Sequence, residues 1–395
     1  MYGNRMNDVD EHLHENKPQA GHAPFMDLKE KIQNLPSTPG VYLMKDARGS
    51  ILYVGKSKHL KKRVQSYFHH SQTHAPKIKK LVQHVKDLEV IRTDTEFEAF
   101  MLECNLIHKY KPMYNRKMKN TASYAYIVIP ASDGLRHIET TNHPVPAHGD
   151  SIFGPYPTSR IAVEKAVVNI LESLKIACTP AAAATAPCLN RAIGLCLGMC
   201  MGGEGLKEYQ RLMNRFIGLL EGTDRSLYDE LERKMAAASE QFDFEAAAKF
   251  RDVLQSIRFL EHKEKVIGFA GSNPNVLLYE PVDEETIKLF LVKRHTILFS
   301  RSFPVATDRE RQQLTKEAGM LVRAYFKNDE DAYTSEVGRD EIDEAQIIYS
   351  YVQSHPGQVA LIPDAWLNTD NPSELNAAMA SFFSDIIKDS NINLD

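Results

Sequence analysis

Residues 40–56, GVYLMKDARGSILYVGK, decide how the first part of this chain folds. Two apolar and aromatic runs, GVYLMK and SILYVGK, stand on either side of the tetrapeptide DARG. Asp46 and Gly49 in that tetrapeptide are residues that tight turns favour, so the pattern predicts a β-hairpin. Pairing of the two strands would bring Tyr42 close to Tyr53.

The segment that follows the hairpin, SKHLKKRVQSYF, predicts a helix rich in cations. Leu60, Val64 and Phe68 recur every four residues, which places them on one helical face. The Lys-Lys-Arg run at 61–63 lies beside that face. Cations are therefore expected to flank the end of the hairpin, although a Lys/Arg-rich helix face is often simply solvated.

The charge of the chain is distributed unevenly. Residues 40–119 contain 17 Lys and Arg against 7 Asp and Glu, a local net charge of +10, whereas the whole chain has a formal net charge of −4. A basic module in an otherwise acidic chain is typical of proteins that bind a phosphate backbone. The sequence therefore predicts a DNA partner for this region, with Lys58, Lys61 and Lys62 as candidate DNA-binding residues.

Together these motifs resemble the GIY-YIG nuclease domain, here in the forms GVY (40–42) and YVG (53–55). The resemblance continues through GKSKHLKKRVQSYF and FEAFMLECNLIHKYKPMYN. These segments are similar to the amino-terminal nuclease of the UvrC family, the component of the UvrABC excinuclease that makes incisions in nucleotide excision repair. We therefore expect an α+β nuclease domain over residues 35–118.

The resemblance implies a role for each of seven side chains in this domain. Tyr42, with Tyr53 beside it, would activate or orient the attacking water. Contact with the phosphate is implied for Lys56, Arg63 and Tyr67. Glu103 would bind one Mg²⁺ or Mn²⁺ ion, and Asn115 would close the site.

These residue types suit the hydrolysis of a phosphodiester. Negative charge develops on the phosphate oxygens, so cations and a Lewis-acid metal stabilise the transition state. A phenol has a pKa of about 10, and a neighbouring ammonium such as that of Lys56 would lower it. Mg²⁺ prefers one or two carboxylates and keeps several waters, which suits a solitary Glu103. Taken singly, a strand tyrosine is more often a packing residue, and only the joint spacing favours a nuclease.

Size and composition indicate a multidomain protein outside the membrane. At 395 residues, with 43% hydrophobic and 25% charged residues, the chain is expected to form two to four domains. We find no run of 18 apolar residues and no leader-like start, so we expect no membrane partner and a cytoplasmic location. Residues 1–34 are expected to be a disordered tail whose histidines are solvated.

Four clustered cysteines predict a second site. Cys178, Cys188, Cys196 and Cys200 have the spacing C-x9-C-x7-C-x3-C, and clustered thiols without a secretion signal favour a metal over disulfides. The spacing lacks the paired C-x2-C of a common zinc ribbon. The family's four cysteines are associated with a 4Fe-4S cluster, so the resemblance implies that cofactor, with Zn²⁺ as the alternative. Four unligated cysteines in a helical connector remain a further reading.

The segment SLYDELERKMAAASEQFDFEAAAKFRDVLQSIRFLE, residues 226–261, predicts a helical hairpin. Two helical patterns flank QFDFE, which breaks the phase between them. The segment resembles the UVR motif, through which proteins of the UvrC family meet UvrB. Phe242 and Phe244 are the expected aromatic anchors for that partner. A plain helical linker is the alternative.

The last part of the chain predicts a mixed α/β domain. VIGFAG, NVLLYEPV, TIKLFLV, TILFSRSF and VALIP are strand-like, and helices are expected near residues 314–326 and 340–352. This part resembles the family's region after the UVR motif. No counterpart of the family's ribonuclease-H-like second nuclease or of its helix-hairpin-helix module is expected in this chain.

The expected fold class is thus multidomain α/β. The expected division is a disordered tail at 1–34, a GIY-YIG nuclease domain at 35–118, a helical connector with the four cysteines at 119–222, a UVR helical hairpin at 223–262 and a mixed α/β domain at 263–395.

The resemblance implies a metal-dependent endonuclease that cuts damaged double-stranded DNA on the 3′ side of a lesion together with UvrB. The alternative is a noncatalytic adaptor that binds UvrB and modulates repair. A homing or restriction nuclease that shares only the first domain comes third, and the UVR-like hairpin argues against it.

Overall fold

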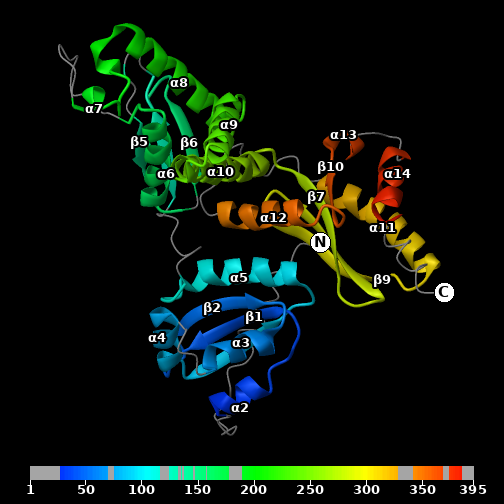
Figure 1. The fold of residues 1–395 in the computed structure, drawn as a ribbon. Coiled ribbons are helices and arrows are strands. Elements are labelled where there is room, and N and C mark those ends of the chain that lie inside the picture. The colour runs from blue at the N-terminus through cyan, green and yellow to red at the C-terminus, as the bar shows by residue number, and fades with distance from the viewer. Residues whose placement is uncertain are drawn as a thin grey trace.

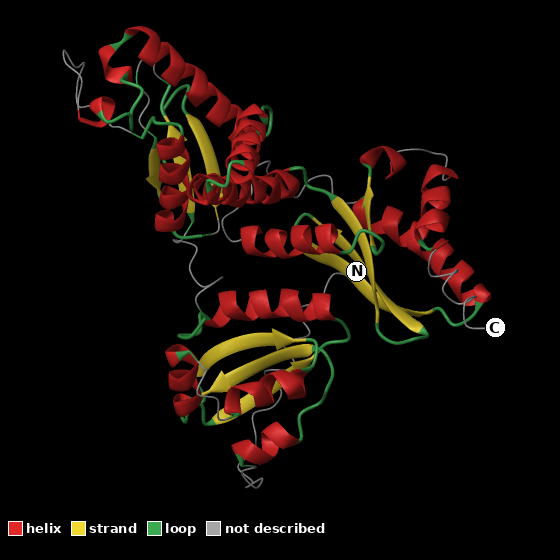
Figure 2. Cartoon of the chain, in the orientation of Figure 1, coloured by secondary structure: helices red, strands yellow, loops and turns green. Residues whose placement is uncertain are grey.

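The computed structural model describes residues 27–69, 75–115, 124–131, 135, 138–145, 147–156, 158–177, 189–327, 341–367 and 373–384. These residues form three units, each built around an antiparallel sheet with helices packed on it (Figure 1). Figure 2 shows that helices and strands are mixed in every unit. The multidomain α/β class expected from the sequence is confirmed.

The first unit is a three-stranded sheet covered by helices. Its elements are α2 (Leu28–Gln33), β1 (Gly40–Lys45), β2 (Ile51–Ser57), α3 (Leu60–Phe68), α4 (Pro76–His84), β3 (Asp87–Arg92) and α5 (Glu96–Tyr110). The strand order is β2-β1-β3, and the antiparallel register of β1 with β2 confirms the predicted hairpin. Side chains of β1 alternate between the faces, so that Tyr42 and Met44 pack against α3 and α4 while Val41 and Leu43 pack against α5.

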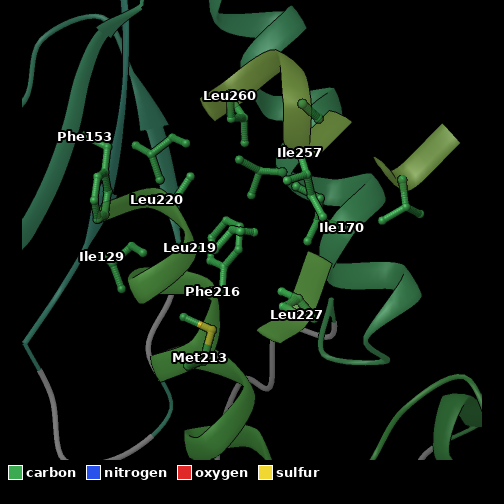
Figure 3. Close-up of a cluster of buried hydrophobic side chains, with 14 of the residues drawn as sticks. Ile129, Phe153, Ile170, Met213, Phe216, Leu219, Leu220, Leu227, Ile257 and Leu260 are labelled. Atoms are coloured by element: carbon green, nitrogen blue, oxygen red, sulfur yellow. The ribbon is translucent and has the colours of Figure 1, made fainter. Parts of the chain in front are cut away.

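The second unit places several helices against a small sheet. Its elements are β4 (Ala125–Ile129), β5 (Glu139–Thr141), β6 (Ser151–Tyr156), α6 (Arg160–Ser173), α7 (Leu189–Ala192), the 3-10 helix η2 (Met199–Met201), α8 (Gly203–Glu221), α9 (Ser226–Glu240) and α10 (Phe244–Gly271). The strand order is β5-β4-β6. Figure 3 shows the core, where Phe216 of α8 lies among Ile170 of α6, Leu227 of α9 and Ile257 of α10. The predicted helical hairpin is therefore present as α9 and α10, and its apolar stripe is part of this core.

Helix α10 is longer than the sequence indicated. It runs without a break to Gly271, through the whole of VIGFAG, so the prediction of a strand there was wrong, and the helix continues past the domain boundary expected at 262. Val266 is fully buried and packs with Tyr124 and Ile342, and Ala270 is fully buried as well. An apolar run of six residues has no decisive periodicity, and here contacts on several sides of one helix account for its apolar character.

The third unit is a four-stranded sheet with helices on both faces. Its elements are β7 (Asn275–Pro281), β8 (Thr286–Lys293), β9 (Thr296–Pro304), α11 (Asp308–Phe326), α12 (Ile342–Ser354), β10 (Val359–Ile362), α13 (Asp364–Leu367) and α14 (Ser373–Phe382). The strand order is β10-β7-β8-β9. Leu277 and Tyr279 of β7 face the core with α11 and α14, whereas Val276 and Leu278 face α12. Burial on both faces explains why these strands read as continuous apolar runs.

Helix α5 joins the first unit to the third. A capping box starts it, because the Thr95 side chain accepts the Glu98 N–H and the Glu98 carboxylate accepts the Thr95 N–H. Phe97 is fully buried and packs edge-on against Phe290 of β8 at 5.2 Å and against Tyr351 of α12 at 5.0 Å between ring centroids. Figure 1 shows α12 lying between α5 and the third sheet. The first and third units therefore share a core.

Part of the segment expected to be a disordered tail, residues 1–34, forms a helix. Residues 1–26 lie outside the described residues, but α2 forms within the expected tail and buries Ile32, with Leu35 after it. Both side chains join the core beneath α3 and α4. Within the described part of the chain, none of the helices is both long and apolar enough to cross a membrane.

The Glu280 carboxylate of β7 is a polar anchor of this shared core, and we predict that its removal destabilises the protein. Its Oε2 accepts the N–H of Phe97 at 2.9 Å, and its Oε1 accepts the hydroxyl of Tyr351. Glu280→Ala would leave two buried donors without an acceptor, which costs about 2 kcal/mol or more of the free energy of unfolding. Urea denaturation would measure this loss. Glu284→Ala, in the exposed turn after β7, should change the same free energy by less than about 0.5 kcal/mol, and equal losses in the two variants would contradict the assignment.

Candidate active site

The site lies along the outer edge of β2, the edge strand of the first sheet. Its outward backbone groups have no neighbouring strand, and side chains and the segment after α5 satisfy them instead. Asn115 accepts the Val54 N–H at 3.0 Å and donates to the Val54 carbonyl at 2.8 Å, and the Tyr114 N–H donates to the Leu52 carbonyl at 2.9 Å. This pairing protects the edge from other strands and fixes its position. Asn115, which was expected to close the site, is held against the backbone of β2, and its role in closing the site stays a prediction.

Three tyrosines meet beside this edge. Tyr42 of β1, Tyr53 of β2 and Tyr67 of α3 have ring centroids 5.9 to 6.2 Å apart. The hydroxyls of Tyr42 and Tyr67 share a buried hydrogen bond of 2.9 Å. The predicted proximity of Tyr42 and Tyr53 is confirmed. Tyr67 belongs to the buried face of α3 with Leu60 and Val64, and Phe68 lies only partly buried beside it.

Gly55 is required by the close approach of Tyr42. The two residues are paired across β1 and β2, and a Cβ on Gly55 would lie 2.4 Å from the Tyr42 hydroxyl oxygen. Real Cβ atoms do not come so close to another atom, so only glycine lets the phenol lie across the strand. The glycine of YVG is therefore explained by the tyrosine of GVY.

Burial raises the pKa of two of these tyrosines, Tyr42 and Tyr53. Burial is the main cause that raises the pKa of Tyr42 far above its ordinary value, and the neighbouring Tyr67 and Tyr53 add to the effect. The pKa of Tyr53 is raised as well, by burial first and then by Tyr67 and Glu103. The Arg63 guanidinium acts in the opposite direction on both groups. Arg63 donates to the Tyr67 hydroxyl at 3.2 Å and lies over its ring.

Glu103 of α5 approaches the same edge from the other face of the sheet. Its Oε1 accepts the backbone N–H of Lys56 at 3.2 Å. Burial raises the pKa of this carboxyl, and the charges of Lys56 and Arg63 partly offset that rise. A desolvated carboxylate gains from a bound metal ion, because the ion replaces the charge stabilisation that water no longer supplies. Tyr42, Tyr53, Tyr67, Arg63 and Glu103 are thus gathered around one strand edge, although they come from four elements.

The Lys56 ammonium does not act on the tyrosines as the sequence suggested. It pairs with Glu96 at 3.1 Å and lies 3.0 Å from the centroid of the Phe100 ring. The expectation that Lys56 lowers a tyrosine pKa was therefore wrong, because burial dominates and Arg63 is the cation that opposes it. Sequence reasoning missed both partners, since neither a helical Glu nor a helical Phe indicates by itself which strand residue it will meet.

The three lysines expected to contact DNA lie at the start of α3. Lys58 and Lys62 are exposed and Lys61 is partly buried. Lys58 precedes α3 and the other two lie in its first turn, so these lysines belong to the same segment as Arg63 and Tyr67, and their contact with DNA stays a prediction.

The predicted cysteine site is described only in part. Cys178 and Cys188 lie outside the described residues. Cys196 is buried, and its sulfur accepts the Gly198 N–H at 3.3 Å, while Cys200 is partly buried. Binding of a cluster or of zinc by these cysteines therefore stays a prediction.

The two aromatic residues of the helical hairpin are exposed at its turn. Phe242 and Phe244 are 78% and 65% exposed, with ring centroids 6.2 Å apart. Phe242 has a φ of 57°, in the left-handed region that non-glycine residues rarely adopt, because it forms the tight turn between α9 and α10. Two large apolar side chains that stay in solvent are available to a partner.

Comparison with known proteins gives three matches to family models, in chain order. A UvrC-like GIY-YIG domain matches residues 38–116, the middle domain of the UvrC/Cho excinuclease matches residues 124–219, and the UvrB/uvrC motif matches residues 226–258.

Curated relatives extend the similarity beyond these models. UvrABC system protein C of Moorella thermoacetica is 33% identical over 329 residues, which cover 83% of this chain and 53% of the relative. The protein of the same name in Caldanaerobacter subterraneus subsp. tengcongensis is 38% identical over 274 residues, which cover 68% of this chain and 44% of the relative. The chain spans about half the length of the curated relatives it matches.

A solved structure matches the first unit. The GIY-YIG N-terminal endonuclease domain of UvrC from Thermotoga maritima, bound to magnesium, is 39% identical with a TM-score of 0.21, and the match covers 22% of this chain and 96% of that domain. With the GIY-YIG domain, the middle domain and the UVR motif in succession, and with relatives of one name along most of its length, the chain belongs to the UvrC family.

Proposed function

We propose that this protein is a metal-dependent endonuclease that acts in nucleotide excision repair together with UvrB. It hydrolyses a phosphodiester of damaged double-stranded DNA on the 3′ side of the lesion. The observation that carries the proposal is the convergence of the Tyr42–Tyr67 pair, Arg63 and Glu103 at the outer edge of β2. Membership of the UvrC family supports it, as does the local net charge of +10 in residues 40–119.

Glu103 is the residue that would hold Mg²⁺ or Mn²⁺. Oxygen ligands from one or two carboxylates suit these hard cations, and a single carboxylate leaves coordination positions for water and phosphate. Among the described residues, no hydrogen bond or ion pair engages the second oxygen of Glu103, so it is free to take a cation. The bound ion would polarise the phosphate and stabilise its developing charge.

The surrounding side chains complete the chemistry. Because the raised pKa keeps Tyr42 protonated, its hydroxyl serves to orient water or phosphate by hydrogen bonding rather than as a ready-made base. The Arg63 guanidinium, fixed against Tyr67, can donate to phosphate oxygens as they gain charge. Lys58 and Lys62, which are exposed, would bind the DNA backbone without contacting the reacting atoms.

We predict that Glu103→Ala removes cleavage but not DNA binding. The substitution deletes the carboxylate that would hold the metal and no group that contacts the backbone, so incision of lesion-bearing duplex in Mg²⁺ with UvrB should fall roughly 100-fold or more. End-labelled DNA measures the rate and the side of the lesion, and fluorescence anisotropy measures binding. Glu103→Gln should also lose activity, because it keeps an acceptor for the Lys56 N–H but lacks the charge.

Glu89→Ala is the matched control, because Glu89 lies on β3 and pairs with Lys45 away from the site. This variant should cut like the wild type. Metal-dependent cutting that survives in Glu103→Ala would contradict the metal-site assignment. A wild-type protein that binds UvrB but does not cut with Mg²⁺ or Mn²⁺ would leave the adaptor function in place of the nuclease.

The exposed turn of the helical hairpin is the proposed contact with UvrB. Replacing Phe242 and Phe244 with Ala removes two apolar anchors, and such anchors typically contribute about 2 kcal/mol or more each. Loss of one such anchor alone corresponds to a roughly 30-fold weaker affinity, so the affinity of the double variant for UvrB should fall at least that much, which titration calorimetry would measure. UvrB-stimulated incision should fall with it, whereas metal-dependent nicking without UvrB should persist.

Ile161→Ala is the control for this prediction. Ile161 is a similarly exposed apolar residue, 71% exposed on α6, and its replacement should leave the affinity for UvrB unchanged. If the double phenylalanine variant still binds UvrB like the wild type, the hairpin is a helical linker and not the contact.

The four cysteines are proposed to bind a 4Fe-4S cluster, with Zn²⁺ as the alternative. Cys-only ligation suits such a cluster, and the Gly198 N–H donated to the Cys196 sulfur is a bond of the kind that tunes cluster thiolates. Protein purified without oxygen should be brown with broad visible absorption, and Cys196→Ser should remove the colour. Cys104→Ser, outside this group, should not. Colourless wild-type protein with stoichiometric zinc would decide for the structural zinc site.

A further inference from the structure

A second group of metal-ligating side chains lies between α5 and α12, outside the four cysteines and outside the site at β2. Cys104 and His108 are four residues apart on α5, so they share one face, and Glu344 of α12 meets them. The Cys104 sulfur is 3.9 Å from Nε2 of His108, and Nδ1 of His108 is 3.2 Å from Oε1 of Glu344. One donor atom from each residue can be chosen so that all three lie within 4.8 Å of one another.

The group is buried and polar where the two units meet. Cys104 is fully buried and Glu344 is 8% exposed. The second carboxylate oxygen of Glu344 is buried and has no hydrogen-bond partner among the described residues. Buried carboxylate oxygens are nearly always paired, because an unpaired one is costly. A cation bound at the junction would satisfy this oxygen.

We propose that Cys104, His108 and Glu344 bind a divalent transition-metal ion of the zinc class. Thiolate, imidazole and carboxylate are the three ligand types of zinc sites, and the buried thiol selects against Mg²⁺. Asp343 supports the ligands from the next position on α12. Its Oδ2 contacts Nε2 of His108 at 3.0 Å and accepts the Tyr124 hydroxyl at 3.2 Å. A carboxylate on the second ring nitrogen is the usual support of a ligating histidine.

The proton balance of the exchange is simple. Counted from a thiol on Cys104 and an imidazolium on His108 beside two carboxylates, the group must give up two protons to become a ligand set. A divalent ion that binds the thiolate and the neutral imidazole displaces two protons to solvent. The net charge of the buried group is then the same before and after binding.

This site is distinct from the one proposed at Glu103. Glu103 and Cys104 are neighbours on α5 but point to different partners, since Glu103 accepts the Lys56 N–H at the edge of β2 while Cys104 packs in the core shared with α12. A metal at Cys104 would fasten α12 to the helix that carries Glu103. Because its ligands differ from the groups at the edge of β2, binding of this metal can be measured without a cleavage assay.

Titration of the chelator-treated full chain with Co²⁺ tests the proposal. Thiolate-bound Co²⁺ absorbs in the near ultraviolet by charge transfer, and the difference between wild type and Cys104→Ser isolates the contribution of this cysteine from those of the other thiols. We expect the wild type to bind one equivalent more than Cys104→Ser and to show additional charge-transfer absorbance, which appears as a band in the difference spectrum of the two proteins. His108→Gln and Glu344→Gln should weaken this equivalent at least roughly tenfold. Glu245→Gln, an exposed carboxylate on α10, should leave it unchanged.

Thermal unfolding gives an independent measurement. Zn²⁺ should raise the melting temperature of the wild type by more than that of Glu344→Gln, a nearly isosteric variant that remains informative if Cys104→Ser fails to fold. Identical Co²⁺ spectra and stoichiometry in wild type and Cys104→Ser, or an equal Zn²⁺ effect on the melting of wild type and Glu344→Gln, would overturn the proposal. The group would then be an imidazolium bridge between two carboxylates and no metal site.

Discussion

Helix α5 is buried from two directions, and the geometry of the candidate site depends on that double burial. One face supplies Ala99, Leu106 and Ile107 to the core beneath β1, while another packs Phe97 and Met101 against the third unit. Glu103 lies on the first of these faces, at four-residue spacing between Ala99 and Ile107, and its carboxylate reaches the edge of β2. A helix held on both sides has little freedom to rotate, so the ligand proposed for the catalytic metal is positioned by the packing of two units and not by its own domain alone.

The tyrosine cluster shows how the same packing sets the chemistry. Tyr42 can lie across the strand only because its cross-strand partner is Gly55, and this placement buries the phenol beside Tyr67. Burial then keeps the hydroxyl protonated, which makes it a hydrogen-bond donor at neutral pH. Arg63 supplies the positive charge that the Lys56 ammonium, engaged by Glu96, does not supply. In the proposed reaction the cluster would hold a phosphate or a water in place, and the metal ion proposed at Glu103 would activate it.

Local spacing carried most of what the sequence could predict, and long-range contacts account for the rest. The hairpin, the α3 helix and the meeting of Tyr42 with Tyr53 follow from patterns within 30 residues, and the α9–α10 hairpin follows from helical periodicity in the same way. The end of α10 was missed because burial of Val266 depends on Tyr124 and Ile342, which are distant in sequence. The group at Cys104 and Glu344 could not be predicted either. The two residues lie on different helices with 239 residues between them, and neither has neighbours in sequence that indicate a metal site.

The long helix α10 links the proposed partner contact to the candidate active site through a series of packed helices. Its 28 residues span about 42 Å, from the exposed turn at Phe242 to the base of the third unit. Near its far end, Phe269 packs against Tyr349 of α12 at 5.4 Å between ring centroids, and α12 in turn holds α5 through His108. Helix α10 therefore connects the turn that would bind UvrB to α12, and α12 contacts α5, the helix that carries Glu103. The packed contacts that lead from this turn to Glu103 therefore run through α10, α12 and α5, because α5 packs against α12 and the third sheet.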